Sequence, residues 1–153
     1  MKVFRLAKKA YIRDLTGSGA EKYGGRWNNI GTSMLYTCEH RSLAVLEVAV
    51  HIQLHIMPKD YYMLELEVPD EKENIHKPNH YLPDDWDSFP YGQSSQRFGD
   101  SFIRANKFLS LKVPSAIIKH EYNYLINPFH KLAQDIEIID CYPFVFDYRL
   151  MRQ

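Results

Sequence analysis

Three residue types that could act together on a charged ligand lie within one short stretch near the N-terminus. Arg26 follows two glycines, Tyr36 stands between apolar residues, and Glu47 falls in the apolar segment after Ser42. A charged side chain among apolar residues is costly unless it is paired or functional. A guanidinium, a phenol and a carboxylate in this order indicate a site that holds an anion and stabilises a cation.

Glu47 lies on an expected helix that begins at Ser42 and runs to about residue 54. A spacing of three or four residues places its side chain in an apolar stripe with Leu43, Val50 and Leu54. This pattern favours a buried acid with a specific partner, and His51 lies one turn further on. The pattern is also compatible with a boundary glutamate that reaches solvent through its stem.

Glu47, His51 and His55 recur at intervals of four residues. A carboxylate and two imidazoles on one helix are a possible set of metal ligands. Residues at i, i+4 and i+8 drift around a helix, however, and span about 12 Å along its axis. One metal ion could not easily bind both ends of such a row, so we expect no metal here and an exposed His55.

Arg26 and Tyr36 each have a structural alternative. Arg26 follows Gly25, which allows close backbone approach to a ligand, and an arginine can make a bidentate contact with phosphate or carboxylate. The same residue could instead stack on Trp27 at the surface. Tyr36 has the flanks of a core tyrosine whose hydroxyl is hydrogen-bonded.

Two polar segments in the second half of the chain are typical of turns. Ser115 follows Val113 and Pro114, and no Gly-x-Ser-x-Gly elbow marks it as a nucleophile. Asn127 precedes Pro128 in the other segment. Taken singly, neither segment indicates a site.

Hydrophobic alternation and turn residues predict an α+β fold with a mostly antiparallel sheet, two main helices and long loops. The expected strands cover 2–8, 34–37, 61–68, 113–118, 122–126 and 135–146. A second helix, capped by Ser94 or Ser95, is expected to run to about residue 109. Residues 14–25 are expected to form a loop, and Glu65 and Glu67 to line a solvated face of the strand 61–68. Segment 70–93 is long for a loop, which favours a functional role or a surface excursion that packs through Trp86, Phe89 and Tyr91.

Composition narrows the class of protein. The chain has 153 residues, which favours one domain over 1–153, and 19 basic and 19 acidic residues give a formal charge of zero. Scattered basic residues argue against direct nucleic-acid binding, and a low net charge fits a chain that works in a complex. Cys38 and Cys141 are expected to be buried, reduced thiols. No apolar run resembles a signal peptide or a membrane span, so we expect a cytoplasmic protein that does not bind membranes.

Together the motifs form one ordered pattern over residues 3–147. It consists of Gly25-Arg26-Trp27-Asn28, Gly31, Tyr36, Ser42-Leu43-Ala44 with Leu46-Glu47, Gly99-Asp100, Val113-Pro114-Ser115, and Asn127-Pro128 with His130. This pattern resembles the RES domain family, which is named for its Arg, Glu and Ser. No single motif is specific, but the ordered set is.

The resemblance implies a fold like that of ADP-ribosyltransferases and the toxin of a bacterial type II toxin–antitoxin system. Such a toxin degrades NAD+ by cleaving the nicotinamide–ribose bond, through hydrolysis or phosphorolysis, or transfers ADP-ribose to a protein target. NAD+ is then a substrate, and no metal is implied. The partner implied is an Xre-like antitoxin that blocks the active site in a hetero-oligomer and makes any contact with DNA itself.

By motif position, the family's catalytic residues fall on Arg26, Tyr36, Glu47 and Ser115, and its accessory NAD+-binding positions on His51 and Asn127. Cleavage of the nicotinamide–ribose bond passes through an oxocarbenium-like state, which a carboxylate stabilises. We therefore expect Glu47 to act on the ribose, Arg26 on the pyrophosphate, Tyr36 on a ring and Ser115 on the ribose or carboxamide. The alternative from another class is a non-catalytic module that only senses a nucleotide.

Overall fold

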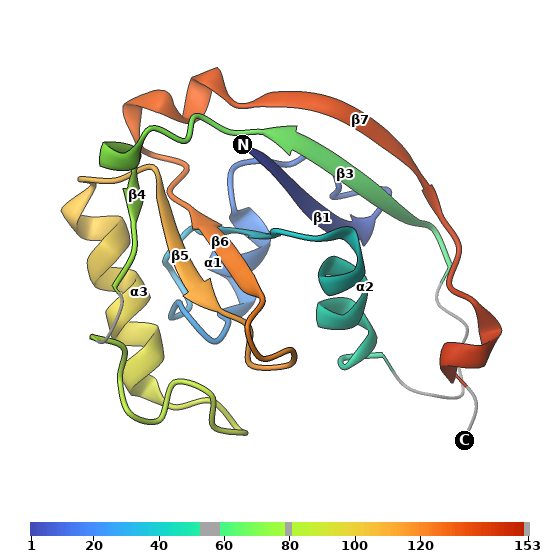
Figure 1. Ribbon diagram of the computed structural model, residues 1–153, viewed down its shortest axis with the longest axis horizontal. Helices are drawn as coiled ribbons and strands as arrows, with labels where there is room; N and C mark the ends of the chain where they lie inside the picture. The colour runs from blue at the N-terminus through green and yellow to red at the C-terminus, as the bar shows by residue number, and fades with distance from the viewer. Residues whose placement is uncertain (53–58, 79–80, 152–153) are drawn as a thin grey trace.

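The computed structural model describes residues 1–52, 59–78 and 81–151. These residues form a seven-stranded sheet in the order β4-β5-β6-β2-β1-β3-β7 (Figure 1). Its strands are β1 (Lys2–Lys8), β2 (Leu35–Cys38), β3 (Tyr61–Glu67), β4 (Ile75–His76), β5 (Ser110–Pro114), β6 (Tyr122–Ile126) and β7 (Glu137–Phe144). Only the short β4 pairs in parallel, with β5. The expectation of a mostly antiparallel α+β sheet is confirmed.

The expectation of two main helices is also confirmed by α2 (Arg41–Ala49) and α3 (Gln93–Ala105). Two short 3-10 helices, η1 (Lys72–Asn74) and η2 (Lys131–Asp135), join other elements, and a third, η3 (Tyr148–Met151), follows β7. The prediction of a loop over 14–25 is wrong, because this segment contains α1 (Ser18–Tyr23). No residue of α1 is buried, so the sequence carries no apolar stripe that would reveal the helix.

The ends of the main helices differ from the prediction. α2 begins after His40 without a side-chain cap, and residues 53–54 of the expected helix lie outside the described residues. α3 begins after Gly92 rather than at a serine cap. It ends at Ala105 because Asn106 adopts a left-handed conformation, with φ of 46°. Residues 106–109, the last expected turn, are therefore irregular chain that leads into β5.

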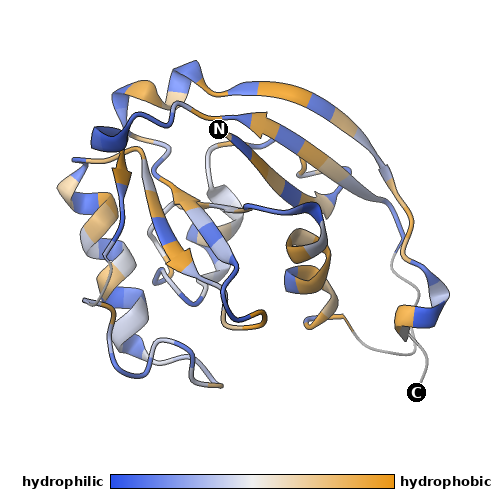
Figure 2. Cartoon of the chain, viewed as in Figure 1, coloured by the Kyte–Doolittle hydropathy of each residue, from blue (hydrophilic) through white to orange (hydrophobic). Residues whose placement is uncertain are grey.

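The sheet has two differently covered faces. One face, called here the helix face, contacts both main helices: α2 packs on Phe4, Leu6, Cys38 and Met63, and α3 packs on Leu111, Val113 and Leu125. The opposite face buries Val3, Leu35, Leu64, Leu66 and Ile126 beneath loops and η2. Figure 2 shows the resulting alternation of hydrophobic and hydrophilic residues along β3 and β7, and the largely hydrophobic α2.

The prediction of a solvated face on β3 is wrong for Glu65. Glu65 opposes Phe4 in the strand register and is buried beneath α2. Its Oε1 accepts hydrogen bonds from Arg41 Nη2 (2.6 Å) and from the Tyr142 hydroxyl (3.1 Å). Alternation alone did not show this, because the partners lie on other elements.

This ion pair makes stability depend on pH. The hydrogen bond from Arg41 holds the pKa of the Glu65 carboxyl below its usual range. A lowered folded-state pKa stabilises the protein above the unfolded-state value, and this stability is lost as the pH falls through the folded-state value. Wild type should therefore be more stable than Glu65→Gln near neutrality. The difference in unfolding free energy should shrink from about pH 5 to about pH 2 in urea titrations, and a pH-independent difference would contradict the assignment.

The two cysteines are free thiols, Cys38 buried and Cys141 half-buried. Strand register places Cys38 opposite Phe4 on the helix face and Cys141 opposite Leu64 on the other face, so the sheet separates them. None of the helices in the described part of the chain is long and apolar enough to cross a membrane.

Candidate active site

The segment that carries Arg26 is fixed by a buried asparagine. Asn28 donates through Nδ2 to the carbonyl oxygens of Ala20 (2.8 Å) and Thr32 (3.0 Å). Its Oδ1 accepts a hydrogen bond from the Tyr36 hydroxyl (2.8 Å). Nδ2 also donates to the carbonyl oxygen of Asn29 (3.0 Å). Both ends of the Asn28 amide are therefore hydrogen-bonded within the protein. Asn28 thus ties the Arg26 loop to α1 and to β2.

Helix α3 holds the same loop from the other side. Both carboxylate oxygens of Asp100 accept hydrogen bonds from Asn29, one from the backbone N–H (3.0 Å) and one from Nδ2 (2.8 Å). Gln96 donates to the carbonyl oxygen of Gly25 (3.1 Å). Gly99 lies against the Trp27 backbone, where a Cβ would be 2.8 Å from the carbonyl carbon. The Gly99-Asp100 motif thus positions the Arg26 loop.

Arg26 is anchored by the last part of the excursion 70–93, residues 86–91. Its Nη1 donates to the carbonyl oxygens of Trp86 (2.8 Å) and Ser88 (2.9 Å), and its guanidinium lies 5.6 Å from the centre of the Tyr91 ring. Within the described residues, its Nε and Nη2 have no hydrogen-bond partner. The guanidinium is held at one nitrogen and keeps other donors for a ligand.

The aromatic residues of the excursion behave differently from one another. Trp86 stacks on Trp27 with ring centres 6.3 Å apart, which confirms that the excursion packs through Trp86 and shows that it packs on the Arg26 loop. Tyr91 lies under the Arg26 guanidinium. The expectation that Phe89 also packs is wrong, because its side chain is 89% exposed.

Tyr36 has its hydroxyl fully engaged. The hydroxyl donates to Asn28 Oδ1 and accepts from the Trp27 backbone N–H (3.0 Å). Burial raises the pKa of the Tyr36 phenol well above its ordinary value, so it stays neutral. The hydroxyl therefore supports the Arg26 loop, and the ring is the part of Tyr36 that can contact a ligand.

Glu47 forms the second half of the site. Its Oε1 accepts hydrogen bonds from Ser115 Oγ (3.0 Å) and from Asn123 Nδ2 (2.7 Å). Ser115 follows β5 and Asn123 lies on β6, so the contact joins α2 to the turn between these strands. Among the described residues, the other carboxylate oxygen, Oε2, has no hydrogen-bond partner. Sequence reasoning missed Asn123; the only signal was a polar residue in phase with Leu125 in a short strand.

The two halves of the site are the Arg26 loop with Tyr36, and Glu47 with its partners. They lie along one strip of the helix face. Tyr36 and Cys38 are alternate residues of β2, about 7 Å apart along the strand, and Cys38 pairs with Asn123. Burial and the nearby Glu47 carboxylate raise the pKa of the Cys38 thiol well above its ordinary value, which places this thiol close to the acid. The strip thus carries a guanidinium at one end and a carboxylate at the other.

Two predicted NAD+-binding residues are not brought into this strip. His51 is exposed just beyond α2, where its backbone N–H donates to Val48. Asn127 is buried at the far end of β6, about 13 Å along the strand from Asn123, and donates to Asn106 Oδ1 (2.9 Å) and Ile103 O (3.4 Å). It supports the end of α3. A ligand role for either residue stays a prediction.

The expected apolar stripe of α2 is only partly present. Leu43 is buried and Glu47 is half-buried, but Val50 is 56% exposed. Leu54 and His55 lie outside the described residues. The stripe is wrong at Val50 because α2 ends at Ala49, and the next residue that packs on the core is Ile52 instead.

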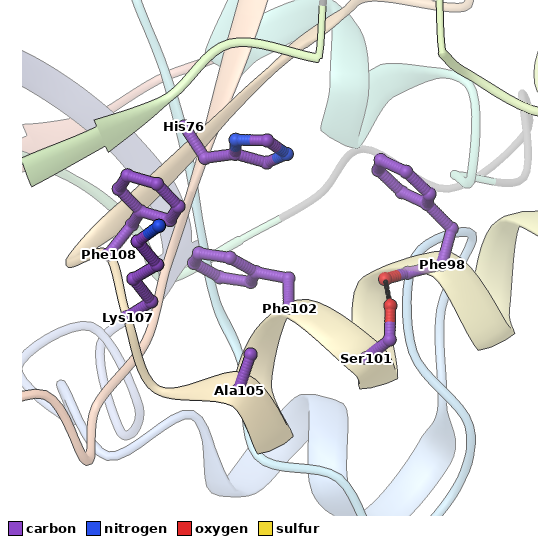
Figure 3. Close-up of a pocket in the computed structure, with 7 residues that line it drawn as sticks. All are labelled: His76, Phe98, Ser101, Phe102, Ala105, Lys107 and Phe108. Carbon is purple, nitrogen blue, oxygen red and sulfur yellow. Dashed lines mark hydrogen bonds between the residues drawn. The ribbon is translucent and has the colours of Figure 1, made fainter.

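A separate pocket lies between α3 and β4 (Figure 3). It has a volume of about 180 Å³, and its side chains, including Phe98, Phe102 and Phe108, point toward one space beside His76. This volume is below that of usual ligand pockets, and none of the predicted site residues lines it. No group of three or more potential metal ligands occurs among the described residues.

Comparison with known proteins decides the family. The model of the RES domain matches residues 2–147. The chain belongs to the RES domain family. This RES domain is 38% identical over 143 residues to "Prs ADP-ribosylating toxin" of Sphingobium sp., covering 92% of this chain and 88% of that protein.

Two further relatives are both called "Toxin Res". The protein of Photorhabdus laumondii is 33% identical over 157 residues, with 99% of this RES domain and 98% of the relative covered. The protein of Yersinia enterocolitica is 34% identical over 152 residues, with 98% and 99% covered.

A solved structure shares the fold. A chain in the crystal structure of the M. tuberculosis MbcT–MbcA toxin–antitoxin complex superposes with a TM-score of 0.74. The similarity covers 94% of this RES domain and 84% of that chain at 16% sequence identity.

Proposed function

We propose that this RES domain is the toxin of a bacterial type II toxin–antitoxin system and cleaves the nicotinamide–ribose bond of NAD+. The observation that carries the proposal is the Glu47 carboxylate, whose Oε1 is fixed by Ser115 and Asn123 while Oε2 is left for a ligand. It lies on the same strip of sheet as the anchored Arg26. The names of the relatives support the toxin role.

The chemistry follows from the charges of the strip. When the bond between ribose C1′ and the nicotinamide nitrogen breaks, its electron pair leaves with nicotinamide and positive charge builds on the ribose. Glu47 Oε2 would stabilise this charge. Nicotinamide is a good leaving group, so no strong general acid is required, and the engaged hydroxyl of Tyr36 fits this.

Arg26 would bind the pyrophosphate. Its Nη1 is occupied by two carbonyl oxygens, which leaves Nε and Nη2 to make two parallel hydrogen bonds with phosphate oxygens. The rings of Tyr36 and Tyr91 lie near this guanidinium and would contact a base. We propose the excursion 70–93 as the part of the chain that sets the position of Arg26.

Arg26→Lys tests this division of contacts. A lysine keeps the charge but cannot serve both carbonyl oxygens and a bidentate phosphate contact. We expect KM for NAD+ to rise about tenfold or more, with a smaller change in kcat. Arg104→Lys, at the exposed end of α3, is the control and should leave both constants unchanged. Equal KM values for wild type and Arg26→Lys would remove Arg26 from the binding site.

A second function is favoured by one relative. The Sphingobium protein is named as an ADP-ribosylating toxin, which supports transfer of the ADP-ribosyl group to a protein side chain rather than to water or phosphate. The binding and bond-breaking steps are the same for each acceptor, and only the group that attacks C1′ differs.

The proposed partner is an antitoxin of the Xre type. The MbcT–MbcA structure is that of a toxin–antitoxin complex, and the low net charge of this RES domain favours work in a complex. The antitoxin would cover the active site in a hetero-oligomer and make any contact with DNA. We propose the cytoplasm as the place of action.

The deciding experiment follows nicotinamide release from NAD+ by the antitoxin-free protein. Release that requires added phosphate indicates phosphorolysis, and release without phosphate indicates hydrolysis. Transfer of label from adenine-labelled NAD+ to a cellular protein indicates ADP-ribosylation. Absence of both release and transfer would refute the proposed activity.

A further inference from the structure

Asn123 is an inward-facing amide in the middle of the sheet. It pairs with Cys38 on β2 and with Val113 on β5, so both neighbouring strands enclose it. Its Nδ2 donates to Glu47 Oε1 at 2.7 Å. Its Oδ1 is buried and has no hydrogen-bond partner among the described residues. A buried, unpaired acceptor is unfavourable for folding. The presence of Asn123 at this position is therefore explained better by the hydrogen bond that it donates to Glu47 than by a contribution to stability.

Ser115 completes the contact with the same carboxylate oxygen. The buried Ser115 Oγ accepts hydrogen bonds from the backbone N–H groups of Ile117 (3.1 Å) and Ile118 (3.2 Å). A serine hydroxyl has one proton and two lone pairs. With both lone pairs directed at backbone donors, its proton is directed to Glu47 Oε1. The turn after β5 therefore fixes the orientation of the Ser115 hydroxyl, and this hydroxyl fixes Glu47 Oε1.

The surroundings of Glu47 make such donors necessary. Glu121, in the turn before β6, has a buried Oε2 with no partner among the described residues, and Glu39 follows Cys38 on β2. Glu47, Glu121 and Glu39 each raise the pKa of the Cys38 thiol, so each lies near that thiol, and Glu39 Oε2 is also paired with Lys112 Nζ (4.0 Å). His51 is on the solvent side, beyond α2. Without fixed donors, a carboxylate with acidic neighbours would turn toward solvent.

We infer that Asn123 is a positioning residue of the active site, which acts with Ser115 to fix Glu47 Oε1 and direct Oε2 toward the substrate. This inference rests on the proposed function and deepens it. It assigns the Asn123 amide and the Ser115 hydroxyl to the orientation of the acid, and it leaves contact with the ribose to Glu47.

Two substitutions of similar shape test the inference in the full chain. Asn123→Leu removes the donor, and we expect kcat for nicotinamide release to fall about tenfold to hundredfold while KM changes less than about threefold. Asn123→Asp replaces the donor by a second carboxyl group. As pH is lowered from about 8 to about 6, the carboxyl pair takes up one shared proton and regains a donor to Glu47. Activity of Asn123→Asp relative to wild type should therefore rise as pH falls, whereas the ratio for Asn123→Leu should stay constant.

Thr37→Val is the matched control. It removes a buried side-chain hydrogen bond, from Thr37 Oγ1 to Tyr124 O (2.7 Å), on the opposite face of the same sheet. This variant should lose stability and keep kcat and its pH profile. If both Asn123 variants behave like Thr37→Val, the amide is only structural and the inference is overturned.

A crystal structure of Asn123→Leu decides the question independently of activity. We expect the Glu47 carboxylate to rotate away and its contact with Ser115 to be lost. An unmoved carboxylate overturns the inference. If wild type releases no nicotinamide and transfers no label, the proposed function fails, and this structure still tests whether Asn123 positions Glu47.

Discussion

Glu47→Gln is expected to reduce nicotinamide release from NAD+ by about 10³-fold or more while the protein stays folded. The loss follows because a neutral amide cannot stabilise the positive charge that develops on the ribose. The fold should persist because the amide oxygen still accepts hydrogen bonds from Ser115 and Asn123, at a cost of about 1 kcal/mol. The measurements are single-turnover cleavage of NAD+ and thermal unfolding of the same preparation.

Glu65→Gln is the control for this experiment. Glu65 also lies on the helix face and accepts hydrogen bonds from a side chain, Arg41, but it is outside the strip that contains Arg26 and Tyr36. Its variant should lose stability and keep activity. In cells, Glu47→Gln should no longer arrest growth when expressed without the antitoxin. Growth arrest by Glu47→Gln equal to that of wild type would support a non-catalytic module instead.

Gly99→Ala is expected to lower the free energy of unfolding by about 3 kcal/mol. The added Cβ would overlap the Trp27 carbonyl oxygen and lie 3.2 Å from the Met34 methyl group. The obstacle is backbone, so α3 or the Arg26 loop must shift, and such overpacking usually costs a few kcal/mol. Activity should fall as well, because the same movement displaces Arg26.

Gly19→Ala is the matched control for the steric argument. Gly19 lies in α1, has open space at the position of a Cβ, and has no positive φ. Replacement by alanine in a helix favours the folded state by about 0.5–1 kcal/mol. Urea titrations of both variants should therefore move in opposite directions. Equal stability of Gly99→Ala and wild type would show that α3 does not pack on Trp27 as described.

The sequence identified the main candidate side chains because local patterns, or the order of motifs along the chain, mark them. Helical periodicity placed Glu47 on a helix, and the turn residues before Met34 placed Tyr36 on a short strand. Ser115 stood out only through the ordered motif pattern. The structure places Glu47 and Ser115 in direct contact, although the pair is separated by 68 positions in the chain.

The errors in the fold prediction have different physical causes, and the error at Glu65 comes from packing between distant segments. The buried Glu65 depends on an arginine 24 positions away, and α1 has no buried residue to reveal it. The end of α2 at Ala49 exposes Val50, which periodicity alone had assigned to an apolar stripe. Local patterns report a residue's own conformation and cannot report what the rest of the chain brings to it.

By itself, the sequence determined the sheet-rich α+β class, the family and the candidate residues Arg26, Tyr36, Glu47 and Ser115. Only the tertiary structure decided that Asn123, 76 positions from Glu47, binds the same oxygen as Ser115. The same is true of the contacts by which residues 86–91 hold Arg26. The tertiary structure also decided that Asn127 supports α3 rather than joining the strip. Hydrogen bonds act over about 3 Å in space without regard to chain separation, so these partners are fixed only when the sheet is assembled.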